Sequence, residues 1–135
     1  MVVCQVLLRI GLAFDLTLRD LQNSLKEKSH PWERAKAFDG AALFSPFVPL
    51  PERVADLALQ LLVDGELRQE GGVDLMMYPP AVILRELASF TTLEDGDIVM
   101  TGTPAGVGVI RPGECFEGRV LAGGEVLVSA SWVAR

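Results

Sequence analysis

Three polar side chains near the start of the chain have the types and spacing to share one pocket. Asp15 closes an apolar run, and Arg19 and Gln22 follow it on one face of a predicted helix, three positions apart. A carboxylate, a guanidinium and an amide so placed can hold a small polar ligand. The alternative is an ordinary helix cap followed by a solvated helix face.

A fourth candidate, Lys36, lies between Ala35 and Ala37. A lysine held among small residues can serve as a fixed cation for a carboxylate or an oxyanion. Alternatively, its long side chain extends to solvent.

The stretch from Leu93 to Gly108 reads LEDGDIVMTGTPAGVG. Asp95-Gly96 is a turn signal, and Asp97–Met100 is apolar and β-branched enough to predict a short strand. Thr101–Gly108 then predicts a loop of small residues. Threonine hydroxyls donate hydrogen bonds and glycines admit backbone N–H groups, so this loop can hold an anion. The alternative is a tight loop that uses glycine only for positive φ.

Regular elements must position these groups. A predicted strand over Leu7–Phe14 ends at Asp15, and Thr17 is expected to cap a helix over about Leu18–Lys28. The core stripe of that helix is predicted to be Leu18, Leu21 and Leu25. His30, beside a proline in a polar turn, is expected at the surface. In the next segment, Trp32 and Phe38 are expected to be buried anchors.

The second half of the chain predicts a sheet. Leu57–Gln69 reads as a hairpin with a type I′ turn at Asp64-Gly65, and Cys115–Leu121 and Glu125–Val133 read as two closing strands. A helix begins near Pro79-Pro80, with an apolar face made by Val82, Ile83, Leu87 and Phe90. Together, these expected strands and helices predict a single β-rich α+β domain over residues 1–135, with two or three helices.

Composition excludes several classes of protein. The chain has 135 residues and a net charge of −6, so it lacks the basic surface that nucleic acid requires. Its mean hydropathy is +0.33, yet no run reaches the ~18 apolar residues of a membrane span. The surplus apolar surface is expected to cover a partner subunit or a missing part of the same protein. Cys4 and Cys115 are far apart and predict reduced, buried thiols of a cytoplasmic protein.

Four segments together resemble the C-terminal catalytic domain of the fumarylacetoacetate hydrolase family, in its acylpyruvate hydrolase and isomerase branch. They occur in the family's order and spacing, and they are Phe14–Gln22, Pro31–Phe38, Val63–Gln69 and Leu93–Gly108. The resemblance implies a multilayer β-sheet fold, here lacking its N-terminal strands, and a homodimer. It also implies one Mg²⁺ or Mn²⁺ per subunit and small carboxylic-acid substrates. The reaction is then hydrolysis of the C–C bond of an acylpyruvate-type 1,3-dicarbonyl acid, or a related isomerisation or decarboxylation.

The resemblance also implies roles for the candidate residues. Asp15 matches a metal-binding aspartate, and Lys36 matches the catalytic lysine beside the developing oxyanion. Substrate-binding positions of the family are matched by Arg19, Gln22, Gly102 and Thr103.

Part of the family's pattern is missing from the chain. The family adds two metal-binding glutamates in an E-x-E arrangement and a water-activating His–Glu pair, all upstream of the aspartate, and no E-x-E occurs here. We therefore expect an incomplete metal site and weak binding of Mg²⁺. A non-catalytic family member that only binds a ligand or partner is the alternative to an enzyme, and an unrelated β-rich binding domain is the third hypothesis.

Overall fold

The computed structural model describes residues 9–135, which form two compact units. Unit 1 contains the chain up to Leu12 and again from Ser45 to Arg135, and unit 2 is Ala13–Phe44. The start of the strand predicted over Leu7–Phe14, and Cys4, lie outside the described residues. Each unit is described by itself below.

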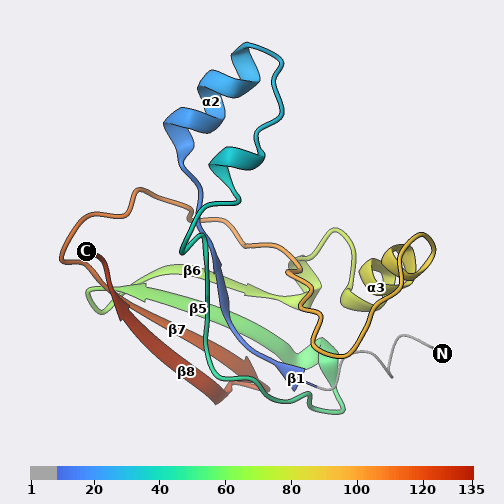
Figure 1. Cartoon of the computed structure of the whole chain (residues 1–135). Coiled ribbons are helices and arrows are strands. Elements are labelled where there is room, and N and C mark those ends of the chain that lie inside the picture. The colour runs from blue at the N-terminus through green and yellow to red at the C-terminus, as the bar shows by residue number, and fades with distance from the viewer. Residues whose placement is uncertain (1–8) are drawn as a thin grey trace. The chain divides into compact units, whose positions relative to one another are not determined.

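Unit 1 is built on a four-stranded antiparallel sheet. Its strands are β5 (Leu57–Val63), β6 (Glu66–Gly72), β7 (Cys115–Ala122) and β8 (Glu125–Val133), in the order β6-β5-β7-β8 (Figure 1). The predicted hairpin is confirmed, because β5 and β6 pair through Asp64 and Gly65 at φ +52° and +83°. Both residues need positive φ for a type I′ turn, which glycine and aspartate tolerate best.

One face of this sheet carries the core of unit 1. The buried side chains alternate along β5 and β7, as period-2 geometry requires, and they include Leu57, Leu61, Val63, Phe116 and Val120. Leu12 is also buried and packs on β7 where Gly118 has no side chain. A Cβ on Gly118 would lie 2.6 Å from Leu12 Cδ2, so the close approach of Leu12 requires glycine there.

Short elements complete unit 1. Strand β1 (Arg9–Ile10) pairs with β4 (Val48–Pro49), and two 3₁₀ turns are η2 (Val54–Asp56) and η3 (Val73–Leu75). The strand predicted over Asp97–Met100 is wrong, because these residues pair with no strand among residues 9–135. Ile98 and Met100 are 50% and 42% exposed, so their apolar alternation does not mark a buried sheet face here.

The predicted helix after Pro79 is confirmed as α3 (Pro80–Ala88), with Pro80 in the first turn. Its predicted apolar face is present but is not the buried side of the helix. Leu84 is 2% exposed, whereas Phe90 is 77% exposed. The other three predicted face residues line an open apolar groove together with Phe90; they are Val82, Ile83 and Leu87.

Leu84→Ala is expected to lower the free energy of unfolding by about 2–5 kcal/mol, because it removes a buried side chain and leaves a cavity. Urea unfolding monitored by circular dichroism measures this change. Leu75→Ala is the matched control, since Leu75 is 70% exposed and its truncation should cost under about 0.5 kcal/mol. Equal losses in the two variants would contradict the burial of Leu84.

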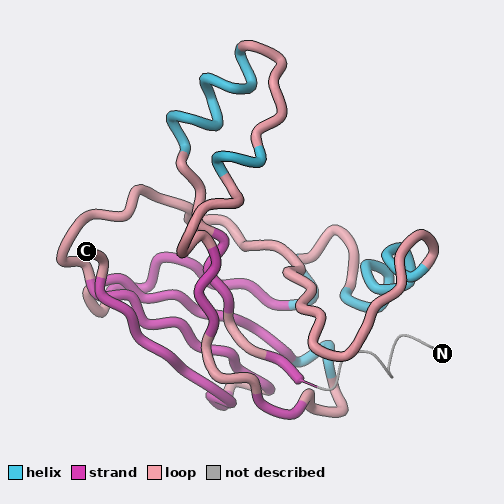
Figure 2. The backbone as a smooth tube through the Cα atoms, in the orientation of Figure 1, coloured by secondary structure: helices cyan, strands magenta, loops and turns pink. Residues whose placement is uncertain are grey.

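Unit 2 is a two-stranded pairing with helical segments between its strands. Strand β2 (Ala13–Asp15) pairs with β3 (Ala42–Phe44), and between them lie α2 (Arg19–Glu27) and η1 (Glu33–Ala35) (Figure 2). The predicted cap is wrong, because Leu18 holds the N-cap position and no side chain caps α2. Leu18, predicted in the core stripe of the helix, is 45% exposed, and Trp32, predicted as a buried anchor, is 44% exposed.

Two observations complete the fold. None of the helices within residues 9–135 is long and apolar enough to cross a membrane. Cys115 is an exposed free thiol, which corrects the prediction that it is buried, because it is the first residue of β7 and lies at the end of that strand, before the buried Phe116. The β-rich α+β class predicted from the sequence is confirmed, with α2 and α3 as the α-helices of the described residues.

Candidate functional site

The central contact of unit 2 is made by Lys36. Its Nζ forms an ion pair with the Asp15 carboxylate and donates a second hydrogen bond to Thr17 Oγ1, at 2.8 Å. The Lys36 side chain is 27% exposed and Asp15 is 54% exposed. The lysine is therefore held by two oxygen partners rather than extended freely to solvent, and Thr17 serves as its acceptor instead of capping α2.

The backbone of unit 2 explains why Lys36 lies beside Asp15. Asp15 ends β2 opposite Ala42 of β3, and Leu18 N donates to Ala35 O at 3.0 Å. Ala35 is completely buried, so the residue before Lys36 is fixed in place. These contacts bring two residues that are 21 positions apart to the same end of β2.

Arg19 and Gln22 form the second polar contact of unit 2. They lie one turn apart on α2, and Arg19 Nη1 donates to Gln22 Oε1 at 3.0 Å. Gln22 is 4% exposed, while Arg19 is exposed. The predicted group of Asp15, Arg19 and Gln22 is thus found as two hydrogen-bonded pairs, Asp15 with Lys36 and Arg19 with Gln22.

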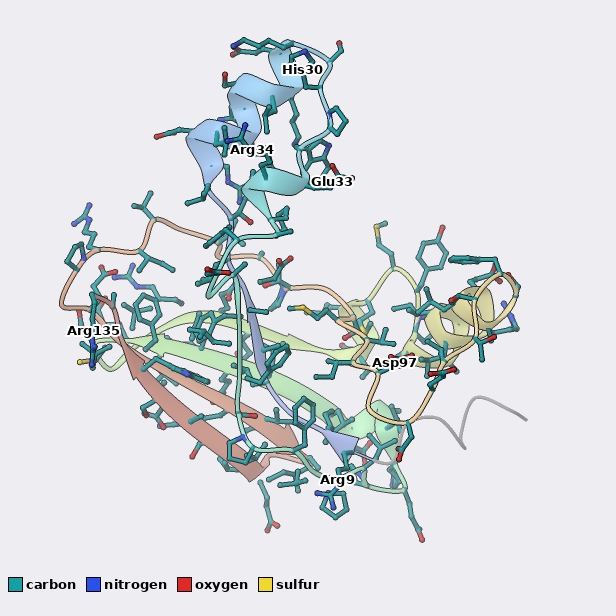
Figure 3. All side chains as sticks on the ribbon, in the orientation of Figure 1. Arg9, His30, Glu33, Arg34, Asp97 and Arg135 are labelled. Carbon is teal, nitrogen blue, oxygen red and sulfur yellow. The ribbon has the colours of Figure 1, made fainter. Side chains whose placement is uncertain are left out.

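His30 lies beyond the C-terminal end of α2, away from Arg19, and Glu33 and Arg34 follow it in η1 (Figure 3). The His30 side chain is exposed, which confirms its predicted surface position.

In unit 1, the candidate loop is held against β6 by Gln69. Gln69 Nε2 donates to Thr103 Oγ1 at 3.2 Å and to Pro104 O at 3.1 Å. Gln69 is 9% exposed. The sequence carries no signal for this burial. A regular two-residue hairpin would pair Gln69 with Gln60, whereas a β-bulge between Leu61 and Leu62 makes Leu61, a buried residue of β5, its partner.

The glycines of this loop are required by its conformation. Gly102 and Gly106 adopt φ of +115° and +99°, as the tight-loop interpretation predicts. A Cβ on Gly106 would overlap the carbonyl oxygen of Arg68 in β6. On the strand side, a Cβ on Gly71 would lie 2.8 Å from Pro104 Cβ. In each of these two contacts between the loop and β6, one of the two residues is a glycine.

The residues that the structure describes do not by themselves provide a complete set of metal ligands. Within residues 9–135, no three side chains of the His, Cys, Asp and Glu types lie close enough together to hold an ion. Asp15 offers one carboxylate, and its oxygen is paired with Lys36. A hard divalent cation needs several oxygen ligands, so these residues alone do not fit one.

One charged pair lies outside both candidate regions. Arg119 Nε donates to Glu117 Oε1 at 2.7 Å on β7, and this hydrogen bond lowers the pKa of the Glu117 carboxyl and raises the pKa of the Arg119 guanidinium. The pair is partly exposed on β7 and is not placed in the candidate site.

The chain belongs to the fumarylacetoacetate hydrolase family. Residues 5–131 match the family model described as "Fumarylacetoacetate (FAA) hydrolase C-terminal". This confirms the resemblance seen in the sequence.

Individual relatives agree with this assignment. The chain is 43% identical over 118 residues to "Oxaloacetate tautomerase YcgM" of Escherichia coli (strain K12). The aligned region covers 82% of this chain and 54% of that protein. It therefore spans about half the length of the curated relatives it matches.

Solved structures share the fold. Yeast ynq8, a fumarylacetoacetate hydrolase family protein, superposes with a TM-score of 0.88 at 34% identity, covering 96% of this chain and 55% of that one. A fumarylpyruvate hydrolase from Pseudomonas aeruginosa, solved in complex with Mn²⁺ and pyruvate, superposes with a TM-score of 0.81 at 34% identity, covering 98% of this chain and 58% of that one.

Proposed function

We propose that this chain is a catalytic-domain segment that acts on small keto acids, by hydrolysis of an acylpyruvate-type C–C bond or by a related tautomerisation or decarboxylation. The observation that carries the proposal is the Lys36 ammonium, held by Asp15 and Thr17 in a chain of this family. Relatives that interconvert oxaloacetate tautomers or bind pyruvate support the substrate class.

Lys36 is proposed as the catalytic group. Its Nζ carries three N–H donors, and Asp15 and Thr17 accept from two of them, so the third can donate to an oxygen on which negative charge develops. Enolate formation places such a charge on oxygen in each of the proposed reactions. A pre-positioned ammonium stabilises that enolate without having to reorganise during the reaction.

Binding of the substrate is proposed for the other candidate residues. Arg19 donates one N–H to Gln22 Oε1, and the remaining N–H groups of its guanidinium are proposed to bind a carboxylate. The guanidinium is planar, so two of its N–H groups can bond to the two oxygens of a carboxylate at once. In unit 1, the Thr103 hydroxyl and the backbone at Gly102 are proposed to bind a carboxylate group.

Asp15 is proposed to contribute one oxygen ligand to Mg²⁺ or Mn²⁺, in line with the Mn²⁺ complex of the fumarylpyruvate hydrolase. We expect the 135-residue chain to bind Mg²⁺ no more tightly than about millimolar, because one carboxylate paired with a lysine supplies too few ligands. Calorimetric titration with Mg²⁺ and with Mn²⁺ measures this. Micromolar binding that disappears in Asp15→Ala would show that a full ligand set exists.

The proposed function is tested by two measurements on the whole chain. Nuclear magnetic resonance titration with oxalate reports which residues contact a dicarboxylate, and the ultraviolet absorbance of enol-oxaloacetate reports tautomerisation with and without Mn²⁺. Turnover that Lys36→Met abolishes supports the proposal. The absence of both oxalate contacts and turnover would overturn it.

A binding-only role is the second candidate, favoured by the single carboxylate that the described residues bring to Lys36. It predicts oxalate contacts without turnover, and no effect of added Mn²⁺.

A further inference from the structure

Gln69 is an unusual residue for its place in the sheet, because its polar side chain is buried on β6 where the hairpin pairs it with Leu61. A buried amide is costly unless its hydrogen atoms are bonded. Both N–H groups of Gln69 Nε2 have partners in the loop, Thr103 Oγ1 and Pro104 O. Within residues 9–135, these are the hydrogen bonds that hold residues 98–110 to the sheet.

The direction of these bonds decides what Thr103 can do. A hydroxyl has one hydrogen to donate and two lone pairs that accept. Because Nε2 can only donate, it occupies a lone pair of Thr103 Oγ1 and leaves the hydroxyl hydrogen for another acceptor. Thr103 is exposed, so that acceptor can come from solution.

We infer that Gln69 is a positioning residue: by donating to Thr103 Oγ1 it fixes the hydroxyl so that its hydrogen points to a ligand carboxylate. The second bond, to Pro104 O, fixes the backbone beside the threonine. This inference rests on the proposed function, in which Thr103 binds the carboxylate.

Packing limits how the loop can adjust if these bonds are lost. Pro104 lies against Gly71, and the backbone at Gly106 lies against the Arg68 carbonyl, on either side of Gln69 along β6. The loop therefore has contacts that keep it near β6, but none of them orients the Thr103 hydroxyl. That orientation depends on the amide of Gln69.

The first test replaces Gln69 with methionine, which has a similar volume but no hydrogen to donate. ¹⁵N relaxation should show the amide order parameters at Gly102, Thr103 and Ala105 falling from about 0.85 to below about 0.6. Gln60→Met is the matched control, because Gln60 donates to the Glu70 carboxylate in the same sheet and not to the loop. Unchanged order parameters in Gln69→Met, in a chain that is still folded, would overturn the inference.

The second test measures oxalate binding from the shifts of the loop amides. We expect Gln69→Met to weaken it about tenfold, the loss typical of one misplaced hydrogen bond to a charged group. In a Thr103→Val background, Gln69→Met should cause almost no further loss, because there is no hydroxyl left to orient. Equal losses in the two backgrounds would overturn the inference, since a general weakening of the fold would not depend on Thr103.

The Gln69→Glu variant distinguishes two roles of Gln69, orienting the Thr103 hydroxyl and holding the loop against β6. A carboxylate at this position accepts instead of donating, so it should draw the Thr103 hydroxyl inward and weaken oxalate binding more than Gln69→Met does. A smaller effect of glutamate would count against the inference. If the wild-type chain shows no oxalate contacts at the loop while the relaxation result holds, the proposed function of the loop fails and the positioning contact itself stands.

Discussion

Replacing Gly106 with alanine is expected to lower the free energy of unfolding by about 2–4 kcal/mol and to displace the loop from β6. Two costs combine at this residue. Its φ of +99° is one that residues with a side chain rarely adopt, and the new Cβ would overlap the carbonyl oxygen of Arg68. Because the obstructing atom belongs to the backbone of a paired strand, no side-chain rotation can relieve the overlap.

The same loop provides graded controls. Gly102 has φ of +115° but open space around its Cβ position, so Gly102→Ala should cost only the backbone strain, about 1–3 kcal/mol. Gly108 has neither feature, and Gly108→Ala should change stability by under about 0.5 kcal/mol. Urea unfolding ranks the three variants. The order Gly106, Gly102, Gly108 is expected, and a cost at Gly108 equal to that at Gly106 would contradict the described packing.

The second large effect is expected at Lys36. Lys36→Met should weaken oxalate binding in unit 2 by about tenfold to a hundredfold, because it removes a charge-assisted donor that Asp15 and Thr17 hold in place. The free energy of unfolding should change by less than about 1 kcal/mol, since the ion pair is partly exposed to water. Loss of binding with retained stability is the signature of a functional lysine.

Lys26→Met is the control for this experiment. Lys26 also belongs to unit 2, and its Nζ lies over the Trp32 ring at 4.7 Å rather than beside a carboxylate. Both variants remove one positive charge, so a nonspecific electrostatic effect would weaken oxalate binding equally in the two. An equal loss would therefore remove Lys36 from the proposed site. Chemical-shift titrations of both variants under one set of conditions make the comparison.

Locally encoded features could be predicted well. The hairpin of β5 and β6 follows from alternating apolar residues around Asp64-Gly65, and α3 follows from the prolines that begin it. Each depends on backbone preferences within a few residues. The strand predicted over Asp97–Met100 failed although its residue types suit a strand, because a strand also needs a partner with which to pair.

Burial was harder to predict than secondary structure. Helix α3 is apolar on several sides, so the sequence does not indicate that Leu84 is buried while Phe90 is exposed. In the helix predicted over Leu18–Lys28, the leucines have helical spacing, but Leu18 is exposed at the N-cap of α2 and Gln22 is buried. Periodicity identifies an amphipathic helix, whereas the neighbouring elements decide which of its sides is covered.

For the candidate site, the sequence by itself determined the family and the residues proposed for the chemistry, because both are contained in short runs of adjacent residues. Only the tertiary structure decided how those residues are paired. Lys36 meets Asp15 and Thr17, and Gln69 holds Thr103 from 34 positions away. Such contacts depend on buried residues and strand pairings that join distant segments, and no local pattern encodes them. The glycine-rich loop shows the division clearly: its composition predicted positive φ, and only its packing against β6 distinguishes Gly106 from Gly108.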